Sequence, residues 1–359
     1  MKKILSVFLV AGLFLPCFGQ TTNYSPMGGE GAVYYLPKTG VKVHVRVEKT
    51  TYTPGELCKY AERSLKMTGV AQEASETYRV VSYGVSTFAI PDKDRSYTMK
   101  LNAKSAATNV VLSDEGVLLA INAEPRTVEE YKPFVPAKRP VAVNPRQFLT
   151  EEMLAAGSYS KLAELVALEI YDIRDSRAML TRGQADYMPS DGEQLRLMLN
   201  DLAVQDEALT SLFCGTTVRD TTEHVVTYIP EPTADEAPVK EVLFRLSKSR
   251  GIVDADDLSG APYYVYVEDL FNAPDPDEDA MEAMARSARA GGVYVNVPGK
   301  VLLKLYQGAR EVLSTNLFLG QFGYPELLSN DLFFKHPTTK LTLNPITGGV
   351  LKLEAESPK

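Results

Sequence analysis

The segment from Val41 to Glu48 alternates strictly between valine and a charged or basic side chain, in the order VKVHVRVE. A strand turns successive side chains to opposite faces, so this pattern predicts a half-buried strand with His44 on its outward face. Other segments repeat the pattern between short turns, including ETYRVVSYGVSTFAI, TTEHVVTYI, PYYVYVEDL, GGVYVNVPG and TTKLTLNP. Many strands with short turns predict antiparallel sheets, as a sandwich or open barrel, instead of a parallel βαβ sheet.

Two helices interrupt the β pattern, at residues 159–182 and 191–213. Both segments are rich in leucine, alanine, glutamate, glutamine and arginine, which are strong helix formers. Because a short loop joins them, we expect them to pack as an antiparallel hairpin. The predicted fold class is therefore α+β, predominantly antiparallel β with an inserted two-helix hairpin.

The loop of this hairpin, TRGQADYMPSDGEQ, holds carboxylates, a glycine and a proline, as a metal loop would. An EF-hand calcium loop needs glycine at its sixth position, but counting from Asp186 places Asp191 there. The residues fit helix ends better. Gly183 is predicted to end the first helix, and Ser190 with Glu193 three residues later to form a capping box for the second.

Charged residues fall inside the apolar stripes of both helices. Glu169 and Arg177 lie within or beside the apolar face of the first helix, and Asp206 interrupts the leucine stripe of the second. An unpaired charge in an apolar environment costs several kcal/mol. We therefore hypothesise that Glu169, Arg174, Arg177 and Asp206 form a buried polar cluster beneath the helices. A structural lock between helices and β body is favoured over an active site.

The chain opens with two lysines, an apolar run of about a dozen residues and the sequence PCFG. This order is that of a secretory signal peptide, because a membrane span would need about 20 apolar residues. We predict cleavage after Gly19. A lipoprotein signal also ends at a cysteine, so a lipid anchor at Cys17 is the alternative, although Pro16 does not suit an enzyme that prefers a small residue there. No later segment is long and apolar enough to be a transmembrane segment.

The formal charge of the chain is −8, and loss of Lys2 and Lys3 with the signal peptide makes it −10. An acidic chain without a basic cluster predicts no nucleic-acid partner. The three histidines stand apart and match no zinc-binding spacing, so we predict no metal site and no cofactor. Free thiols are favoured for Cys58 and Cys214, although export would permit a disulfide between them.

Proline density suggests where the chain divides. Residues 124–148 contain five prolines, which prevent both helix and ladder pairing, so this segment is predicted to be an extended connector. The predicted organisation is a signal peptide over 1–19, an N-terminal β domain with one short helix over 20–123, the connector over 124–148, a helical hairpin over 149–214, and a C-terminal β-rich domain over 215–359.

The helical run from YSKLAELVALEIYDIRDSRAML to LAVQDEALTSLF resembles the domain of unknown function 4831 family, exported proteins of Bacteroidetes. The shorter motifs VYYLPKTGVKVHVRVEK, YAERSL, GQFGYPELL and ITGGVLKLE extend the resemblance over nearly all of the mature chain. The helical motif is specific and the short motifs are not. The resemblance implies export and a full-length family unit, and it carries no activity, ligand or catalytic residue.

Catalytic residue spacings are missing from the sequence, so we expect a non-catalytic binding, assembly or structural module. It would be exported to the periplasm, the outer membrane or the extracellular space, with a protein or glycan of the cell envelope as its partner. The alternative is a secreted or periplasmic hydrolase whose carboxylates converge only in the fold. Such an enzyme requires paired carboxylates, or a nucleophile and a base, that face each other in a concave pocket.

Overall fold

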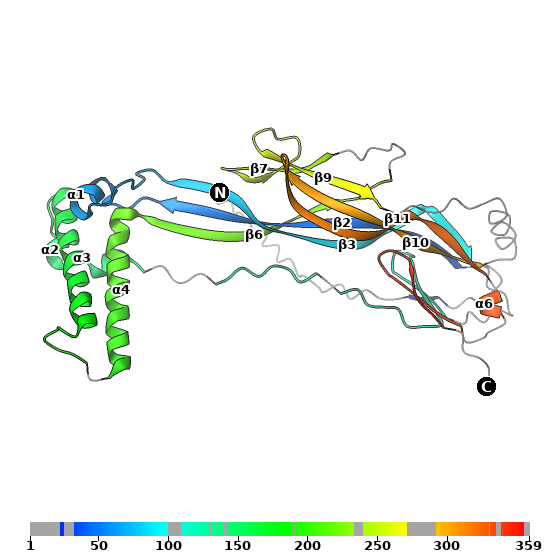
Figure 1. The fold of residues 1–359 in the computed structure, drawn as a ribbon, viewed down its shortest axis with the longest axis horizontal. Coiled ribbons are helices and arrows are strands. Elements are labelled where there is room, and N and C mark those ends of the chain that lie inside the picture. The colour runs from blue at the N-terminus through cyan, green and yellow to red at the C-terminus, as the bar shows by residue number, and fades with distance from the viewer. Residues whose placement is uncertain are drawn as a thin grey trace, which may run out of the picture.

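The fold was obtained as a computed structural model, and strands dominate it (Figure 1). Its sheets are antiparallel and a helical hairpin is inserted between strands, which confirms the predicted α+β class. The predicted signal peptide and Cys17 lie outside the described residues. The structure describes residues 22–24, 32–99, 109–129, 131–138, 143–189, 191–232, 240–270, 292–329, 331–334 and 339–354.

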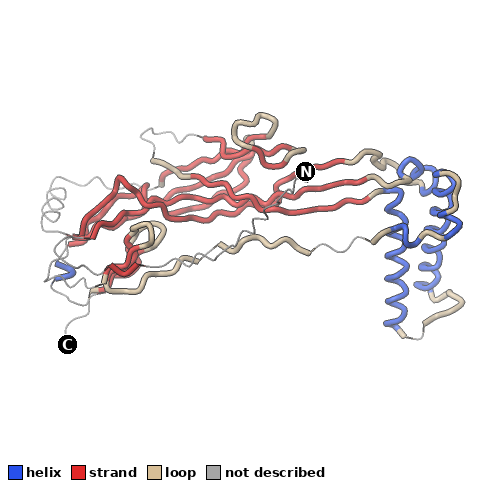
Figure 2. The backbone as a smooth tube through the Cα atoms, turned by 180° about the vertical axis from the view of Figure 1, so that it is seen from behind, coloured by secondary structure: helices blue, strands red, loops and turns tan. Residues whose placement is uncertain are grey.

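A long three-stranded sheet runs through the molecule, in the order β3-β2-β6 (Figures 1 and 2). Its strands are β2 (Ala32–Thr53), β3 (Ser75–Met99) and β6 (Thr216–Tyr228). The 22 residues of β2 extend over about 70 Å at about 3.3 Å per residue. This sheet therefore connects two distant ends of the molecule.

One half of the long sheet packs on a second sheet. Val41, Val43, Val45 and Val47 are buried against it, which confirms the predicted inward face of this strand. Leu303 and Leu305 are among the residues that cover these valines. The second sheet has the order β11-β10-β9-β7-β8 and consists of β7 (Glu241–Ser247), β8 (Gly251–Val253), β9 (Ala261–Asp269), β10 (Gly292–Gln307) and β11 (Arg310–Ser329).

The other half of the long sheet is polar on both faces. Cross-strand ion pairs line it: Lys49 Nζ lies 2.7 Å from Glu76 Oε1, and Arg79 Nε lies 2.8 Å from Glu48 Oε1. Cross-strand pairs of opposite charge stabilise neighbouring strands. Since neither face needs apolar cover, this half can extend beyond the second sheet.

The third sheet lies at the end of the molecule farthest from the helices (Figure 1). Tyr34 and Leu36, from the first residues of β2, are buried in its core, and Phe333 of the short helix α6 (Asp331–Phe334) completes that core. The sheet has the order β1-β4-β5-β12-β13 and consists of β1 (Thr22–Tyr24), β4 (Val110–Leu112), β5 (Leu118–Ile121), β12 (Lys340–Leu343) and β13 (Val350–Glu354).

A buried, uncharged polar cluster joins these sheets, and we call it the junction: Thr39, Asn296, Gln321 and Thr347. Thr39 N–H donates to Gln321 Oε1 at 2.8 Å, and Gln321 Nε2 donates to the carbonyl oxygens of Thr39 and Pro230 at 3.0 and 2.8 Å. Asn296 Nδ2 donates to the Thr347 carbonyl at 2.8 Å. The junction thereby holds β2, β10, β11 and the loop before β13 at one point.

The helices gather at the other end of the long sheet (Figure 2). Their common core includes Leu57, Ile170 and Phe213. At Gly215 the chain turns from helix to strand with φ +74°, and a side chain there would collide with the Thr53 carbonyl. No helix in the described part of the chain has the length and hydropathy to cross a bilayer. The helical elements are η1 (Cys58–Tyr60), α1 (Ala61–Leu65), η2 (Pro145–Phe148), α2 (Glu151–Leu154), α3 (Tyr159–Arg182) and α4 (Gly192–Cys214).

Strands from the predicted N-terminal and C-terminal β regions pair with one another in the same sheets. β2 pairs with β6 from Val41↔Tyr228 to Thr53↔Thr216, and β5 pairs with β12 at Leu341↔Ile121. The physical reason is that a long central strand such as β2 exposes two edges, and only one of them is used by its neighbour in sequence, β3.

The proline-rich connector contains an extended segment that we call the strap, residues 124–129 and 131–138. None of these residues belongs to a helix or strand. From β5, the described part of the connector runs back along the long sheet toward the helices (Figures 1 and 2). The strap lies on the face of the long sheet opposite the second sheet, and its Tyr131 ring covers His44 (Figure 1).

Candidate functional site

Of the predicted capping residues in the hairpin loop, Gly183 and Glu193 lie at helix ends in the described part of the chain. Gly183 is the C-terminal cap of α3, with φ +68°. Ser190 lies outside the described residues, and the N-terminal cap of α4 is Asp191, whose side chain makes no capping hydrogen bond. Glu193 is paired with Arg196 on the same helix. The loop is thus a connection between helices.

The structure brings together only two of the four charges predicted to cluster. Arg174 Nε donates to Asp206 Oδ1 at 3.0 Å, which joins α3 to α4, and the Arg174 side chain is 42% exposed. Arg177 is exposed and Glu169 is half-buried. The pair therefore lies at the rim of the helices, where a long arginine side chain reaches water, and not beneath them.

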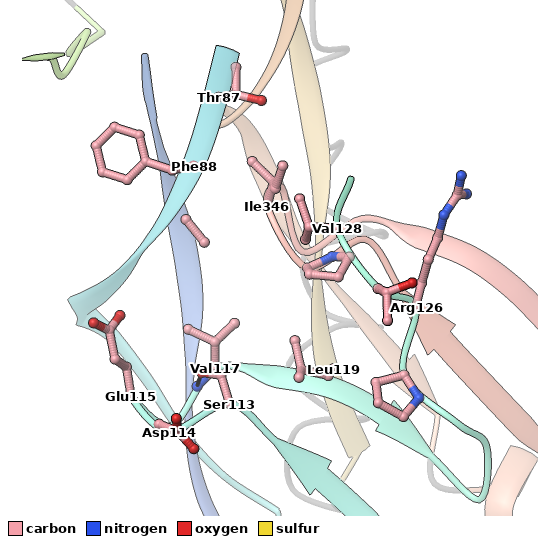
Figure 3. A pocket seen from close by; sticks show the side chains of 14 residues that line it. Thr87, Phe88, Ser113, Asp114, Glu115, Val117, Leu119, Arg126, Val128 and Ile346 are labelled. Carbon is pink, nitrogen blue, oxygen red and sulfur yellow. Dashed lines mark hydrogen bonds between the residues drawn. The ribbon is translucent and has the colours of Figure 1, made fainter. Parts of the chain in front are cut away.

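A groove of about 610 Å³ lies between the strap and the third sheet (Figure 3). Its apolar part includes Leu119, Val128 and Ile346, whose side chains face a common space in Figure 3. Asp114 and Glu115 stand at one end, on the turn between β4 and β5. A mainly apolar concave surface with a few charged groups is typical of ligand sites.

The strap forms one wall of this groove and is held to the sheet a few residues later. Pro125, Arg126, Thr127 and Val128 line the groove. The segment beyond, from Tyr131 to Phe134, contacts His44 and Arg46 of β2 and Glu223 of β6. We call these five side chains, His44, Arg46, Tyr131, Phe134 and Glu223, the latch.

Glu223 is the centre of the latch. Its Oε1 accepts a hydrogen bond from the Tyr131 hydroxyl at 2.7 Å and another from Arg46 Nε at 3.1 Å. Its Oε2 accepts the backbone N–H of Phe134 at 3.3 Å. The Arg46 guanidinium also lies over the Phe134 ring, 4.7 Å from its centroid. One carboxylate thus binds both aromatic residues of the strap.

His44 is buried beneath the strap. Its ring stacks on the Tyr131 ring with centroids 3.5 Å apart, and the side chain is 4% exposed. Nε2 shares a hydrogen bond of 2.7 Å with Ser86 Oγ. Nδ1 has no hydrogen-bond partner among the described residues, and Glu223 Oε2, at 3.9 Å, is too distant to accept one.

The latch fixes the charge states of its members. Burial lowers the pKa of His44 and outweighs the attraction of Glu223, so the ring is neutral at neutral pH. Burial acts to raise the pKa of Glu223, but hydrogen bonds from Tyr131, Phe134 and Arg46 together lower it. Burial raises the pKa of the Tyr131 hydroxyl, which therefore remains a donor.

Comparison with known proteins gives a family and no activity. A family model described as a domain of unknown function, DUF4831, matches residues 30–351. The chain belongs to this family. No curated protein and no solved structure matches the chain.

Three of the short motifs of this DUF4831 chain meet at one place in the structure. VYYLPKTGVKVHVRVEK contains Thr39, GQFGYPELL contains Gln321, and ITGGVLKLE contains Thr347. These are residues of the junction, in which the three motifs meet. The motifs therefore mark the architecture of the β body, and Ile346 of the third motif also lines the groove.

The sequence did not reveal the groove or the latch. His44 was predicted on an outward strand face; it does face away from the buried valines, but the strap covers that face. The signal in the sequence was the pair of aromatic residues Tyr131 and Phe134, which lie in a segment predicted only to be an extended connector. Aromatic side chains in such a segment indicate that it packs against something.

Proposed function

We propose that this chain is an exported protein of the bacterial cell envelope that binds a partner without catalysing a reaction. The groove beside the strap carries this proposal, because its volume of about 610 Å³ lies within the usual range for ligand sites. The predicted signal peptide supports export, with cleavage after Gly19 favoured over a lipid anchor at Cys17. The resemblance to exported proteins supports a source among Bacteroidetes.

The chemistry of the groove favours an extended peptide of a protein partner over a glycan. Leu119, Val128 and Ile346 offer apolar contacts in a row, and Asp114 and Glu115 complement a basic group at one end. A glycan would need hydroxyl-directed polar groups along the groove, whereas its middle is apolar. We therefore assign a peptide with apolar side chains and a basic end as the ligand class.

Binding can be tested with arrays of peptides that tile the exported proteins of the source bacterium, and with a glycan array beside them. Val128→Glu places a charge in the groove and should abolish peptide binding. Val218→Glu, on the exposed polar half of β6, is the matched control because the two valines are 45% and 40% exposed. Glycan binding, or equal peptide binding by both variants, would contradict the assignment.

Export has a separate test. In fractionated cells the protein should lie outside the cytoplasm with a mature N-terminus at Gln20. Incorporation of labelled palmitate into the mature protein would show instead that Cys17 carries a lipid. Recovery of the full-length chain in the cytoplasm would contradict export altogether.

One observation favours the alternative of a hydrolase: Ser86 Oγ lies 2.7 Å from His44 Nε2, as a nucleophile lies beside its base. A catalytic triad also needs an acidic group that orients the histidine, and Glu223 is poorly placed for this role. Its Oε2 is 3.9 Å from His44 Nδ1 and accepts the Phe134 amide instead. Tyr131 also covers the ring. Labelling of the protein by a fluorophosphonate, lost in Ser86→Ala, would establish the hydrolase and remove the non-catalytic proposal.

A further inference from the structure

The strap is attached mainly through side chains. No described strap residue takes part in a β ladder. At the latch, its Tyr131 hydroxyl and Phe134 amide both donate to the single carboxylate of Glu223, and the Tyr131 ring lies on His44. Because ladder pairing does not secure the strap, its docking depends on the state of the latch.

Protonation of His44 would disturb this arrangement. A proton on Nδ1 creates a buried N–H donor, and the closest carboxylate oxygen is Glu223 Oε2, at 3.9 Å. That oxygen already accepts the Phe134 amide at 3.3 Å. At 3.9 Å this oxygen is too far to accept the new N–H, so the charged ring either remains without an acceptor or Glu223 must shift toward it by about 1 Å. The first outcome leaves a buried charge unsatisfied beneath Tyr131, and the second strains the bonds that Glu223 makes to Tyr131 and Phe134, so both weaken the hold on the strap.

We propose that the latch is a pH-sensitive device, in which protonation of His44 releases the strap and thereby opens the groove that the strap borders. The opening of a binding groove rests on the proposed function, whereas the release of the strap does not. The groove wall and the latch belong to one continuous described stretch apart from residue 130, so release at Tyr131 and Phe134 frees the wall at Val128.

The groups that face His44 act on its pKa in both directions. Lys42 and Arg46 on β2 repel a proton, Glu223 on β6 attracts one, Ser86 on β3 hydrogen bonds to Nε2, and Tyr131 of the strap excludes water. Burial is the largest of these influences and lowers the pKa of His44 below 6.5. When the strap leaves, water reaches the ring and the pKa rises again.

The direction of the pH dependence follows from the linkage between proton binding to His44 and docking of the strap. The released state binds the proton more tightly, so docking of the strap is complete above pH 6.5 and is lost as the pH falls through the lower pKa of the docked state. One proton is involved, so the ratio of released to docked strap rises by at most tenfold for each pH unit. Below the pKa of the docked state the ratio becomes constant.

If protonation of His44 weakens docking, then loss of docking must raise the pKa of His44. This pKa can be measured by NMR titration of the histidine rings of the full chain, which has only three histidines. In the wild-type protein His44 should titrate below 6.5, and Tyr131→Ala should raise its pKa. Each unit of this rise corresponds to a tenfold coupling between proton and strap.

Further variants show whether a change in the pKa of His44 comes from the contacts of the latch. Tyr131→Phe keeps the stacked ring but loses the hydroxyl bond to Glu223, so it should raise the pKa of His44 less than Tyr131→Ala does. Lys132→Ala, an exposed neighbour, should leave it unchanged. If Tyr131→Ala does not fold, Phe134→Ala removes the ring that lies against Arg46 but keeps the amide bond to Glu223, so it should loosen the strap and give a smaller rise in the pKa of His44.

An unchanged pKa of His44 in a folded Tyr131→Ala protein would overturn the latch. The titration involves no ligand, so its failure is distinct from failure of the proposed function. Coupling of His44 to Tyr131 without any peptide binding would retain the latch and remove the groove as a binding site. Peptide binding that is independent of pH between 7.5 and 5.5 would show that the latch does not control the groove.

Discussion

The junction and the latch are both polar clusters built on β2, but the junction is buried, the latch is only partly buried, and different groups form them. Every side chain of the junction is neutral, and Gln321 alone makes three hydrogen bonds to main-chain groups of Thr39 and Pro230. Every side chain of the latch except Phe134 is titratable, and the Nδ1 atom of His44 has no partner among the described residues. The strength of the junction is therefore independent of pH, whereas the strength of the latch depends on it.

The two clusters also differ in what they hold. The junction joins segments that are secured by ladders on either side, since β2, β10 and β11 are all long strands. The latch holds a strap whose described residues pair with no strand. Loss of the junction should therefore weaken the whole body, whereas loss of the latch should free one segment.

The largest effect is expected for Gln321→Ala. It leaves the Thr39 amide and the carbonyls of Thr39 and Pro230 unsatisfied in a buried place, so the free energy of unfolding should fall by about 3 kcal/mol. Urea unfolding measures this loss. Gln307→Ala, at the exposed end of β10, is the matched control and should change stability by less than about 0.5 kcal/mol. Similar values for both variants would remove the distinction drawn for the junction.

Glu223→Ala should act locally. It removes the acceptor of both Tyr131 and Phe134, and hydrogen bonds to a charged group are worth about 1.5–3 kcal/mol. Trypsin at pH 8 should then cleave the strap after Arg126 or Lys138 at least about tenfold faster, which is about 1.4 kcal/mol. Glu76→Ala removes an exposed ion pair on β3 and serves as the control. Unchanged cleavage in Glu223→Ala would show that other contacts hold the strap.

As the pH falls, the latch should weaken before the junction does. The lowered pKa of His44 means that strap docking weakens first, as the pH falls below 6.5. Glu223 has a pKa below its ordinary 4.5, so its contribution is present above 4.5 and is lost only as the pH falls through that lower value. The neutral side chains of the junction do not titrate. Trypsin is inactive in acid, so cleavage of the strap by pepsin should be compared with unfolding followed by circular dichroism over the same acidic pH range.

The smallest effect is expected for the helical ion pair. Arg174→Ala removes the bond to Asp206, but the arginine is 42% exposed, so the loss should be about 0.5 kcal/mol. Arg177→Ala, one turn away and exposed, should cause no measurable change. A loss of several kcal/mol in Arg174→Ala would mean that the pair is the structural lock first hypothesised.

Local patterns in the sequence predicted the elements well. The alternation around Val43 predicted a strand with a buried valine face, and helix propensity placed the two long helices within a residue or two of α3 and α4. Both predictions depend on neighbours within one element. The fold class followed from the number of such strands.

Long-range pairing was not predictable in this way. The partner of the second edge of β2 is β6, more than a hundred residues away, and nothing within either strand specifies it. The outward face of His44 likewise gave no sign that a proline-rich connector would return to cover it. The burial of the charged side chains on the two helices was overestimated. A helical pattern gives the direction in which a side chain leaves the helix, but it does not show that a long arginine side chain can reach water.

Two backbone amides permit the most direct test of the central claim. Thr39 N–H donates to Gln321 in the junction, and Phe134 N–H donates to Glu223 in the latch. Hydrogen exchange by NMR should give protection factors for both amides in the wild-type protein at pH 7.5 and 5.5. We predict that protection of Phe134 falls in acid while that of Thr39 is unchanged. Protection of Phe134 that is equal at both pH values, or that falls together with Thr39, would contradict a titratable latch on a fixed body.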